Sequence, residues 1–336
     1  DYVTGSLSFD FLIAVDFTSS NGLPTDPSSL HHFDPASPVT NQYMAAIRAI
    51  GGILNDYSRD HLYTALGFGG KLPDGQVSHN FSLNGNPHDP RCLGIEGVES
   101  AYLQALQSVR LSGPTNFASV IRHATGVARS TPQSQAAQTY HVLLILTDGV
   151  ISDMAETVNS IIDASKDAPL SIIIVGVGSA NFSAMKHLDA DDTPLRSATG
   201  RVASNDVVQF VAFRDQNSSA SLARSVLAEL PDRVVRYFVE RSIMPQPPSF
   251  PPSGESGYFP PPNNASGQWG SQGLASGPVS SGPSSGDLHA SSGRPDPTST
   301  HQNAAPGYYP PQSSSLPFTA AIPPSDTDSG RMDGFI

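Results

Sequence analysis

The chain has 336 residues and a formal net charge of −12 at pH 7. An acidic chain does not offer the clustered Lys and Arg that neutralise phosphates, so a nucleic-acid-binding surface is not expected. Its single cysteine, Cys92, can form neither an internal disulfide nor a cysteine-rich zinc site, which favours a reducing, cytoplasmic setting.

The composition divides the chain into two parts. Residues 1–244 alternate apolar runs with amphipathic stretches and predict one folded domain. Residues 245–336 hold 18 of the 30 prolines and few aliphatic side chains, which predicts a disordered tail. Proline-rich stretches at 245–252 and 306–311 could serve as ligands for proline-binding domains, with an inert linker as the alternative.

Apolar runs and helical periodicity alternate along the first part. The runs predict buried strands at 9–15, 62–68, 140–146, 170–177 and 208–213, with an edge strand at 77–83. The periodicity predicts helices at 41–57, 98–109, 117–130, 154–166, 182–188, 218–230 and 232–241. This alternation predicts an α/β fold: a doubly wound, mostly parallel sheet with helices on both faces, Rossmann-like in class.

Three polar motifs lie at loops next to these elements. Asp16-Phe17-Thr18-Ser19-Ser20 follows the first strand, Gly113-Pro114-Thr115-Asn116 precedes a helix, and Thr147-Asp148-Gly149 follows a buried strand. Ligands of doubly wound sheets gather at the carboxyl ends of the strands, so these motifs are expected to converge.

Five side chains of these motifs form a candidate metal site: Asp16, Thr18, Ser20, Thr115 and Asp148. Two carboxylates and three hydroxyls are hard oxygen ligands, which suit a divalent cation such as Mg²⁺, Mn²⁺ or Ca²⁺ and suit zinc or copper poorly.

The pattern resembles the metal-ion-dependent adhesion site of von Willebrand factor A domains, in which Asp-x-Ser/Thr-x-Ser is joined by a distant Thr and a distant Asp. The resemblance implies that Thr18 and Ser20 bind the ion directly and that Thr115 binds it directly or through water. It implies that Asp16 and Asp148 act mostly through water. One coordination position is then left for the carboxylate of an acidic segment of a protein partner.

Longer segments narrow the resemblance to the A domain of copines. They occur in copine order as DFTSSNG at 16–22, SLHH at 29–32, ALGFG at 65–69, GPTNF at 113–117, TDGVISDM at 147–154, SIIIVGVG at 171–178, VQFV at 208–211 and LAELP at 227–231. They extend to about Arg241 and so span the whole expected folded part.

The copine resemblance carries implications for function. Copines are cytoplasmic proteins that move peripherally to the plasma membrane when calcium rises, and their A domain recruits partners rather than catalysing a reaction. Copines normally carry two calcium- and phospholipid-binding modules before the A domain. Such modules are absent from this chain, so membrane phospholipid is expected to be bound only through them.

Two other functions share parts of the pattern. Asp16 at the end of a first strand is also typical of phosphotransferases or hydrolases that use an aspartate nucleophile, but these have a second Asp where this chain has Thr18. Copine-like ubiquitin ligases add a zinc-bound RING, which a chain with one cysteine cannot form.

Some residues invite a metal interpretation that their spacing does not support. His31 and His32 are expected in a surface loop, because adjacent side chains point in different directions. Asp189, Asp191 and Asp192 lack the glycine and distal Glu of an EF-hand and are expected in a solvated turn. Cys92 is expected to be a buried or idle thiol rather than a nucleophile.

Overall fold

The computed structural model describes residues 2, 7–34, 36, 40–190 and 193–246. The tail predicted at 245–336 lies outside the described residues except for Pro245 and Gln246, and so do Asp191 and Asp192.

A sheet of seven strands forms the centre of the fold. Its main path runs β10-β9-β8-β1-β2-β5, and β6 also pairs with β2. The parallel strands are β1 (Ser8–Asp16), β2 (Leu62–Phe68), β8 (Thr139–Thr147), β9 (Leu170–Gly176) and β10 (Val208–Ala212). The antiparallel strands are β5 (Phe81–Ser82) and β6 (Arg91–Leu93). The parallel strands are almost entirely buried, which accounts for their continuous apolar runs.

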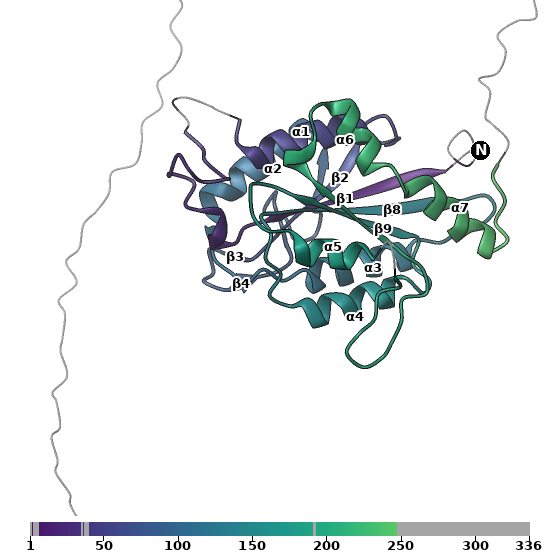
Figure 1. Cartoon of the computed structure of the whole chain (residues 1–336). Coiled ribbons are helices and arrows are strands. Elements are labelled where there is room, and N and C mark those ends of the chain that lie inside the picture. The colour runs from purple at the N-terminus through teal and green to yellow at the C-terminus, as the bar shows by residue number, and fades with distance from the viewer. Residues whose placement is uncertain (1, 3–6, 35, 37–39, 191–192, 247–336) are drawn as a thin grey trace, which may run out of the picture. The chain divides into compact units, whose positions relative to one another are not determined.

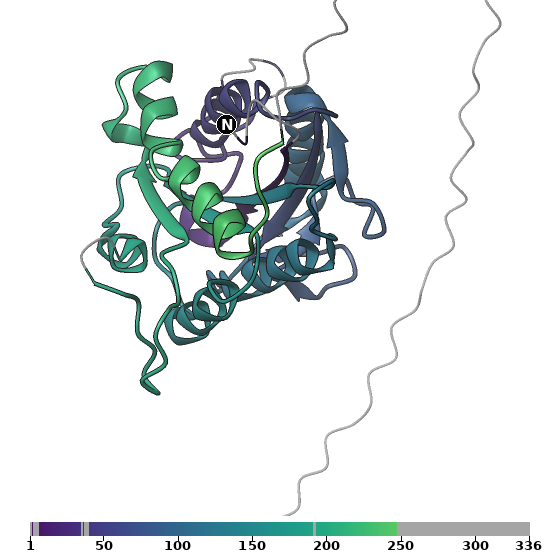
Figure 2. The same ribbon diagram turned by 90° about the vertical axis from the view of Figure 1, so that its right-hand side faces the viewer.

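Helices cover both faces of this sheet (Figures 1 and 2). One face packs against α1 (Gln42–Leu54), α2 (Gly94–Ser108), α6 (Ser219–Val226) and α7 (Leu230–Glu240). The other packs against α3 (Ala118–Ser130), α4 (Met154–Ala164) and α5 (Ser183–Asp189). The predicted doubly wound α/β class is therefore confirmed.

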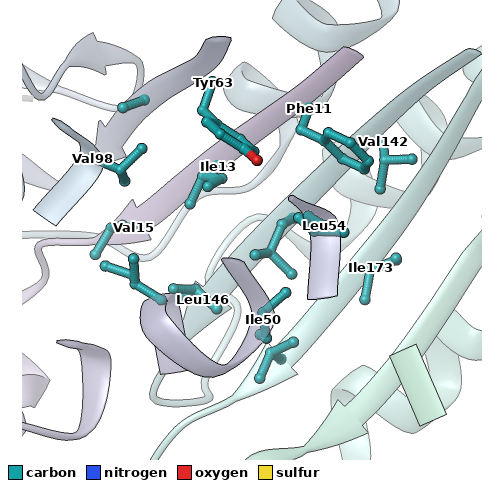
Figure 3. Close-up of a cluster of buried hydrophobic side chains, with 14 of the residues drawn as sticks. Phe11, Ile13, Val15, Ile50, Leu54, Tyr63, Val98, Val142, Leu146 and Ile173 are labelled. Atoms are coloured by element: carbon teal, nitrogen blue, oxygen red, sulfur yellow. The ribbon is translucent and has the colours of Figure 1, made fainter. Parts of the chain in front are cut away.

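Alternate residues of β1 belong to two separate hydrophobic clusters. Phe11, Ile13 and Val15 pack with Ile50 and Leu54 of α1 on one face (Figure 3). The intervening Leu12 and Ala14 pack against the helices of the opposite face. This division follows from the two-residue period of a strand, and it places β1 between the two clusters.

A second, three-stranded sheet replaces part of the predicted edge strand at 77–83. That segment is divided between β4 (Val77–Ser78), which joins the second sheet, and β5, which joins the main one. The second sheet has the order β4-β3-β7, where β3 is Gly70–Lys71 and β7 is Arg110–Leu111. Strands of two residues have too short a pattern to be predicted from periodicity.

Several helix boundaries differ from those predicted. α1 ends at Leu54 rather than at 57, and α6 ends at Val226 rather than at 230. The helix expected at 98–109 begins at Gly94, whose φ of +67° suits glycine and whose N–H donates to the carbonyl of His61. The last helix begins at Leu230 rather than at 232, so Pro231 lies in its first turn, where a missing N–H costs little. Two short 3₁₀ segments, η1 (Ser19–Asn21) and η2 (Phe213–Asp215), complete the described elements.

Candidate metal site

The five predicted site residues converge at the carboxyl edge of the main sheet. Asp16 ends β1, Asp148 directly follows β8, and these two strands are parallel neighbours. Thr18 and Ser20 come from the loop after β1, and Thr115 comes from the loop before α3. Parallel strands end at the same edge, so the topology brings together residues that are distant in sequence.

A chain of short contacts joins the five side chains. Thr18 donates to Asp16 Oδ1 from its backbone N at 2.8 Å and from Oγ1 at 2.6 Å. Thr18 Oγ1 also lies 2.9 Å from Ser20 Oγ. Thr115 Oγ1 donates to Thr18 Oγ1 over 3.4 Å. Ser20 Oγ in turn donates to Asp148 Oδ1 over 3.1 Å. The Thr18 hydroxyl is thus the centre of the cluster.

The solvent exposure of the five side chains increases from the buried Asp16 to the exposed Ser20. Asp16 and Thr18 are 0% and 2% exposed, and Thr115 and Asp148 are also buried. Ser20 is exposed. A ligand therefore reaches the cluster from the side of Ser20, while Asp16 lies at its floor.

Two carboxylates, those of Asp16 and Asp148, share this site. Burial, followed by the nearby charge of Asp148, raises the pKa of Asp16 to about 7, although hydrogen bonds from Thr18 and Thr147 act in the opposite direction. Burial also raises the pKa of Asp148. Among the described residues, no Lys or Arg forms an ion pair with either carboxylate.

This environment fits a divalent cation. An added positive charge would offset the mutual repulsion and the desolvation of the two carboxylates. The hydroxyls of Thr18, Ser20 and Thr115 supply further oxygen donors of the kind that Mg²⁺, Mn²⁺ and Ca²⁺ prefer. Within the described part of the chain no group of three or more His, Cys, Asp or Glu is placed to hold a metal, so the site depends on its hydroxyls.

Two residues that sequence reasoning left out of the site support it directly. Thr147 Oγ1 donates to Asp16 Oδ2 over 2.7 Å, so both carboxylate oxygens of Asp16 have donors. The buried Asn21 donates from Nδ2 to the carbonyl of Thr18 over 3.1 Å and so stabilises the loop that carries Thr18 and Ser20. Both residues belong to motifs that the sequence already marked, but their types alone did not show which groups they contact.

The expectation of a surface loop was wrong for His31, which is fully buried. Its Nε2 lies 2.7 Å from the carbonyl oxygen of Asp16, and its Nδ1 lies 2.7 Å from the Tyr102 hydroxyl. Its ring stacks on Tyr43, whose hydroxyl donates to Asn21. Burial lowers the pKa of His31 to about 3, so the ring is neutral at pH 7. It therefore supports the backbone of the site.

The loop that carries Thr115 is tied to the loop after β8. Ser152 donates its N–H to the carbonyl of Thr115 over 2.8 Å. The carboxylate of Asp153 accepts from the N–H groups of Phe117 and Ala118, each over 3.0 Å, and so satisfies the first turn of α3. Asp153 therefore helps to fix the position of Thr115 relative to Asp148.

Gly69 leaves room for the Thr18 side chain. Its φ is +74°, and a Cβ at this position would lie 2.3 Å from Thr18 Cγ2. Any larger residue would displace the threonine at the centre of the cluster, so glycine is required here both by conformation and by space.

The doubly wound sheet carries this cluster at the carboxyl end of β1, as the resemblance to von Willebrand factor A domains implies. The sequence model of the copine family matches residues 29–246. The chain therefore belongs to the copine family.

Two solved structures are similar to the chain. One is the manganese-loaded TRAP protein of Plasmodium vivax, with 12% identity over 65% of this chain and 72% of that chain, at a TM-score of 0.38. The other is proximal thread matrix protein 1 from the mussel byssus, with 14% identity over 68% of this chain and 47% of that chain, at a TM-score of 0.37. The chain thus spans about half the length of the mussel chain.

Cys92 is free and buried.

No helix among the described residues has both the length and the apolar character needed to cross a bilayer.

Proposed function

We propose that the chain is a divalent-metal-dependent protein-binding module whose ion is held by the cluster around Thr18. The Thr18 and Ser20 hydroxyls would bind the ion directly, Thr115 directly or through water, and Asp16 and Asp148 mostly through water. A carboxylate from an acidic segment of a partner would complete the coordination. The ion would supply the positive charge that attracts this carboxylate.

The observation that carries the proposal is the contact between the Thr18 and Ser20 hydroxyl oxygens, which lie 2.9 Å apart and donate to the carboxylates of Asp16 and Asp148. Within the described residues neither carboxylate forms an ion pair with a Lys or Arg. Removing a hydroxyl from such a set reduces the number of ligands, and removing a carboxylate also reduces the negative charge. Divalent affinity depends on both.

A binding role is favoured over catalysis by the surroundings of Asp16. Its side chain is fully buried, and its two carboxylate oxygens accept hydrogen bonds from Thr18 and Thr147. A nucleophilic aspartate needs an oxygen open to the substrate. The arrangement supports Asp16 as a fixed anion at the floor of a binding site.

For localisation, we propose the behaviour general to the family: a cytoplasmic protein recruited peripherally to the plasma membrane in response to calcium. Phospholipid binding would belong to other modules, and the A domain would bring its protein partner to the membrane.

Calorimetric titration with Mn²⁺ and with Mg²⁺ tests the metal site. We expect saturable heat from the unmodified chain and none from Asp16→Ala. Asp26→Ala is the matched control, since Asp26 Oδ1 accepts from the N and Oγ of Ser28, both over 2.8 Å, in an exposed turn that copies the Asp16–Thr18 arrangement. Equal heats from the unmodified chain and Asp16→Ala would contradict the proposal.

A further inference from the structure

An exposed row of side chains crosses the small sheet beside the candidate metal site. Lys71 of β3 is the register partner of Val77 on β4 and of Arg110 on β7. All three side chains are exposed, Val77 by 42%. The row therefore presents one apolar and two basic side chains to solvent.

The row lies on the outer face of the small sheet. A Cβ at the neighbouring Gly70 would meet the side chains of Val109 and Phe81, so that position faces the core. Successive residues of a strand face opposite sides, so Lys71 faces away from the core. Gly69, on the other side of Gly70, is where the chain meets the Thr18 side chain. The small sheet therefore begins directly beside the buried Thr18 side chain.

Hydrogen bonds connect Ser112, which follows β7, to the loop of the candidate metal site. Ser112 donates its N–H to the carbonyls of Phe17 and Gly69, and it forms a parallel bridge with Thr18. Arg110 lies two residues before Ser112, which corresponds to about 7 Å along a strand. In Figure 1, β3 and β4 lie near the end of the sheet toward which β1 points.

The two cations lie opposite each other on the paired strands. Lys71 and Arg110 are directly opposite on antiparallel strands, an arrangement in which like charges destabilise the pairing. Among the described residues, neither forms an ion pair. Carboxylates lying between the two side chains would relieve the repulsion and form charge-assisted hydrogen bonds.

We propose that Val77, Lys71 and Arg110 form the second half of the partner-binding surface, and that the partner is an extended segment with several clustered carboxylates. This inference rests on the proposed function. One carboxylate would complete the coordination of the ion. The next would follow two or three residues later in the partner and bind Lys71 and Arg110, since an extended chain covers about 3.3 Å per residue.

A protein segment is favoured over an anionic lipid surface by charge. The chain carries a net charge of −12, which repels an extended anionic bilayer, whereas a short peptide experiences mainly the local field of the ion and the two cations. Val77 at the end of the row also provides contact for an apolar side chain next to the acidic ones.

Fluorescence anisotropy with two labelled peptides tests the inference. The first probe is a short Gly/Ser peptide with one Glu, and the second has additional Glu residues two and three positions further on. In Mn²⁺ and at low salt, we expect the second peptide to bind the unmodified chain about tenfold more tightly, because its additional carboxylates pair with Lys71 and Arg110. This difference should decrease as salt is raised.

The double variant Lys71→Gln/Arg110→Gln should lose this difference while binding the first peptide and Mn²⁺ normally. Arg196→Gln/Arg224→Gln, which removes two exposed charges elsewhere, should keep it. The Lys71→Gln/Arg110→Gln variant should also melt at no lower temperature than the unmodified chain, since like-charge repulsion is removed. A Lys71→Gln/Arg110→Gln variant that retains the tenfold preference overturns the inference.

Two further readouts separate this inference from the proposed function. If the metal proposal fails, Mn²⁺ gives no heat and chelation leaves peptide binding unchanged. Weaker binding of the second peptide to Lys71→Gln/Arg110→Gln would then still support the row as a site for acidic segments. If phosphatidylserine vesicles bind through Lys71 and Arg110 and neither peptide binds, the assignment to a protein segment is overturned.

Discussion

Thr147 Oγ1 donates a hydrogen bond of 2.7 Å to Asp16 Oδ2, across 131 positions of sequence and between adjacent parallel strands. The bond fixes the orientation of the buried carboxylate while Thr18 holds its other oxygen. Removing a group that hydrogen-bonds to a metal ligand, without itself binding the metal, commonly weakens metal affinity by about 10- to 100-fold.

Thr147→Val should therefore weaken Mn²⁺ binding by about tenfold and lower the free energy of unfolding by about 1–3 kcal/mol, because a buried acceptor loses its donor. Thr139→Val, at the other end of the same strand, is the control for replacing a β-strand threonine. Calorimetry and urea unfolding measure the two effects. Unchanged Mn²⁺ affinity in Thr147→Val would show that this bond does not support the site.

The pKa of Asp16 predicts a pH dependence of stability in the metal-free protein. The native carboxyl titrates near pH 7 and the unfolded one near 3.8, so the native state binds more protons between these values. Its contribution to stability is therefore fully present below about pH 4 and is lost as pH rises to about 7.

Urea unfolding in chelator at several pH values tests this dependence. The free energy of unfolding of Asp16→Asn, relative to the unmodified chain, should rise between pH 5 and pH 8 by on the order of 2–4 kcal/mol. Asp26→Asn, in an exposed turn, should show no such rise. A constant difference between Asp16→Asn and the unmodified chain would contradict the raised pKa.

His31 predicts a pH dependence of opposite sign. Its pKa is about 3 in the folded protein and near 6.5 when unfolded, so the unfolded state binds more protons between these values. Its stabilising contribution is present above pH 6.5 and is lost as pH falls toward 3.

His31→Phe removes both hydrogen bonds of the ring and should lower the free energy of unfolding at pH 8 by about 2–4 kcal/mol. The loss should shrink toward pH 5, where the unmodified chain also loses the contribution of His31. His88→Phe, at an exposed position, is the control and should be nearly neutral. A loss from His31→Phe that stays constant with pH would show that burial does not keep this ring neutral.

Gly69→Ala should damage the metal site more than the fold. Alanine at a positive φ costs about 1–2 kcal/mol, and here its Cβ would also displace Thr18 Cγ2. Gly75→Ala is the matched control, because Gly75 has a φ of +86° and nothing within 4 Å of its Cβ position. Both variants should lose the stability that the positive φ costs, Gly69→Ala should lose more because of the clash with Thr18, and only Gly69→Ala should lose Mn²⁺ binding. Equal Mn²⁺ affinities would show that the space beside Thr18 is not needed.

The sequence by itself determined the fold class and the composition of the candidate site. Buried parallel strands require continuous apolar runs, so β1, β2, β8, β9 and β10 were predicted within a few residues of their bounds. The five site residues were marked by their motifs and their places at loops next to these elements, and the structure brings them together. Whether the site binds metal stays a prediction.

Only the tertiary structure decided what surrounds that site. The burial of His31 and the bond from Thr147 to Asp16 depend on partners far away in sequence, which no local pattern encodes. The row of Val77, Lys71 and Arg110 depends on two-residue strands, which are too short to show periodicity and are defined only by their pairing. Local patterns specify which segments are buried, but contacts between distant segments determine what each buried or exposed group meets.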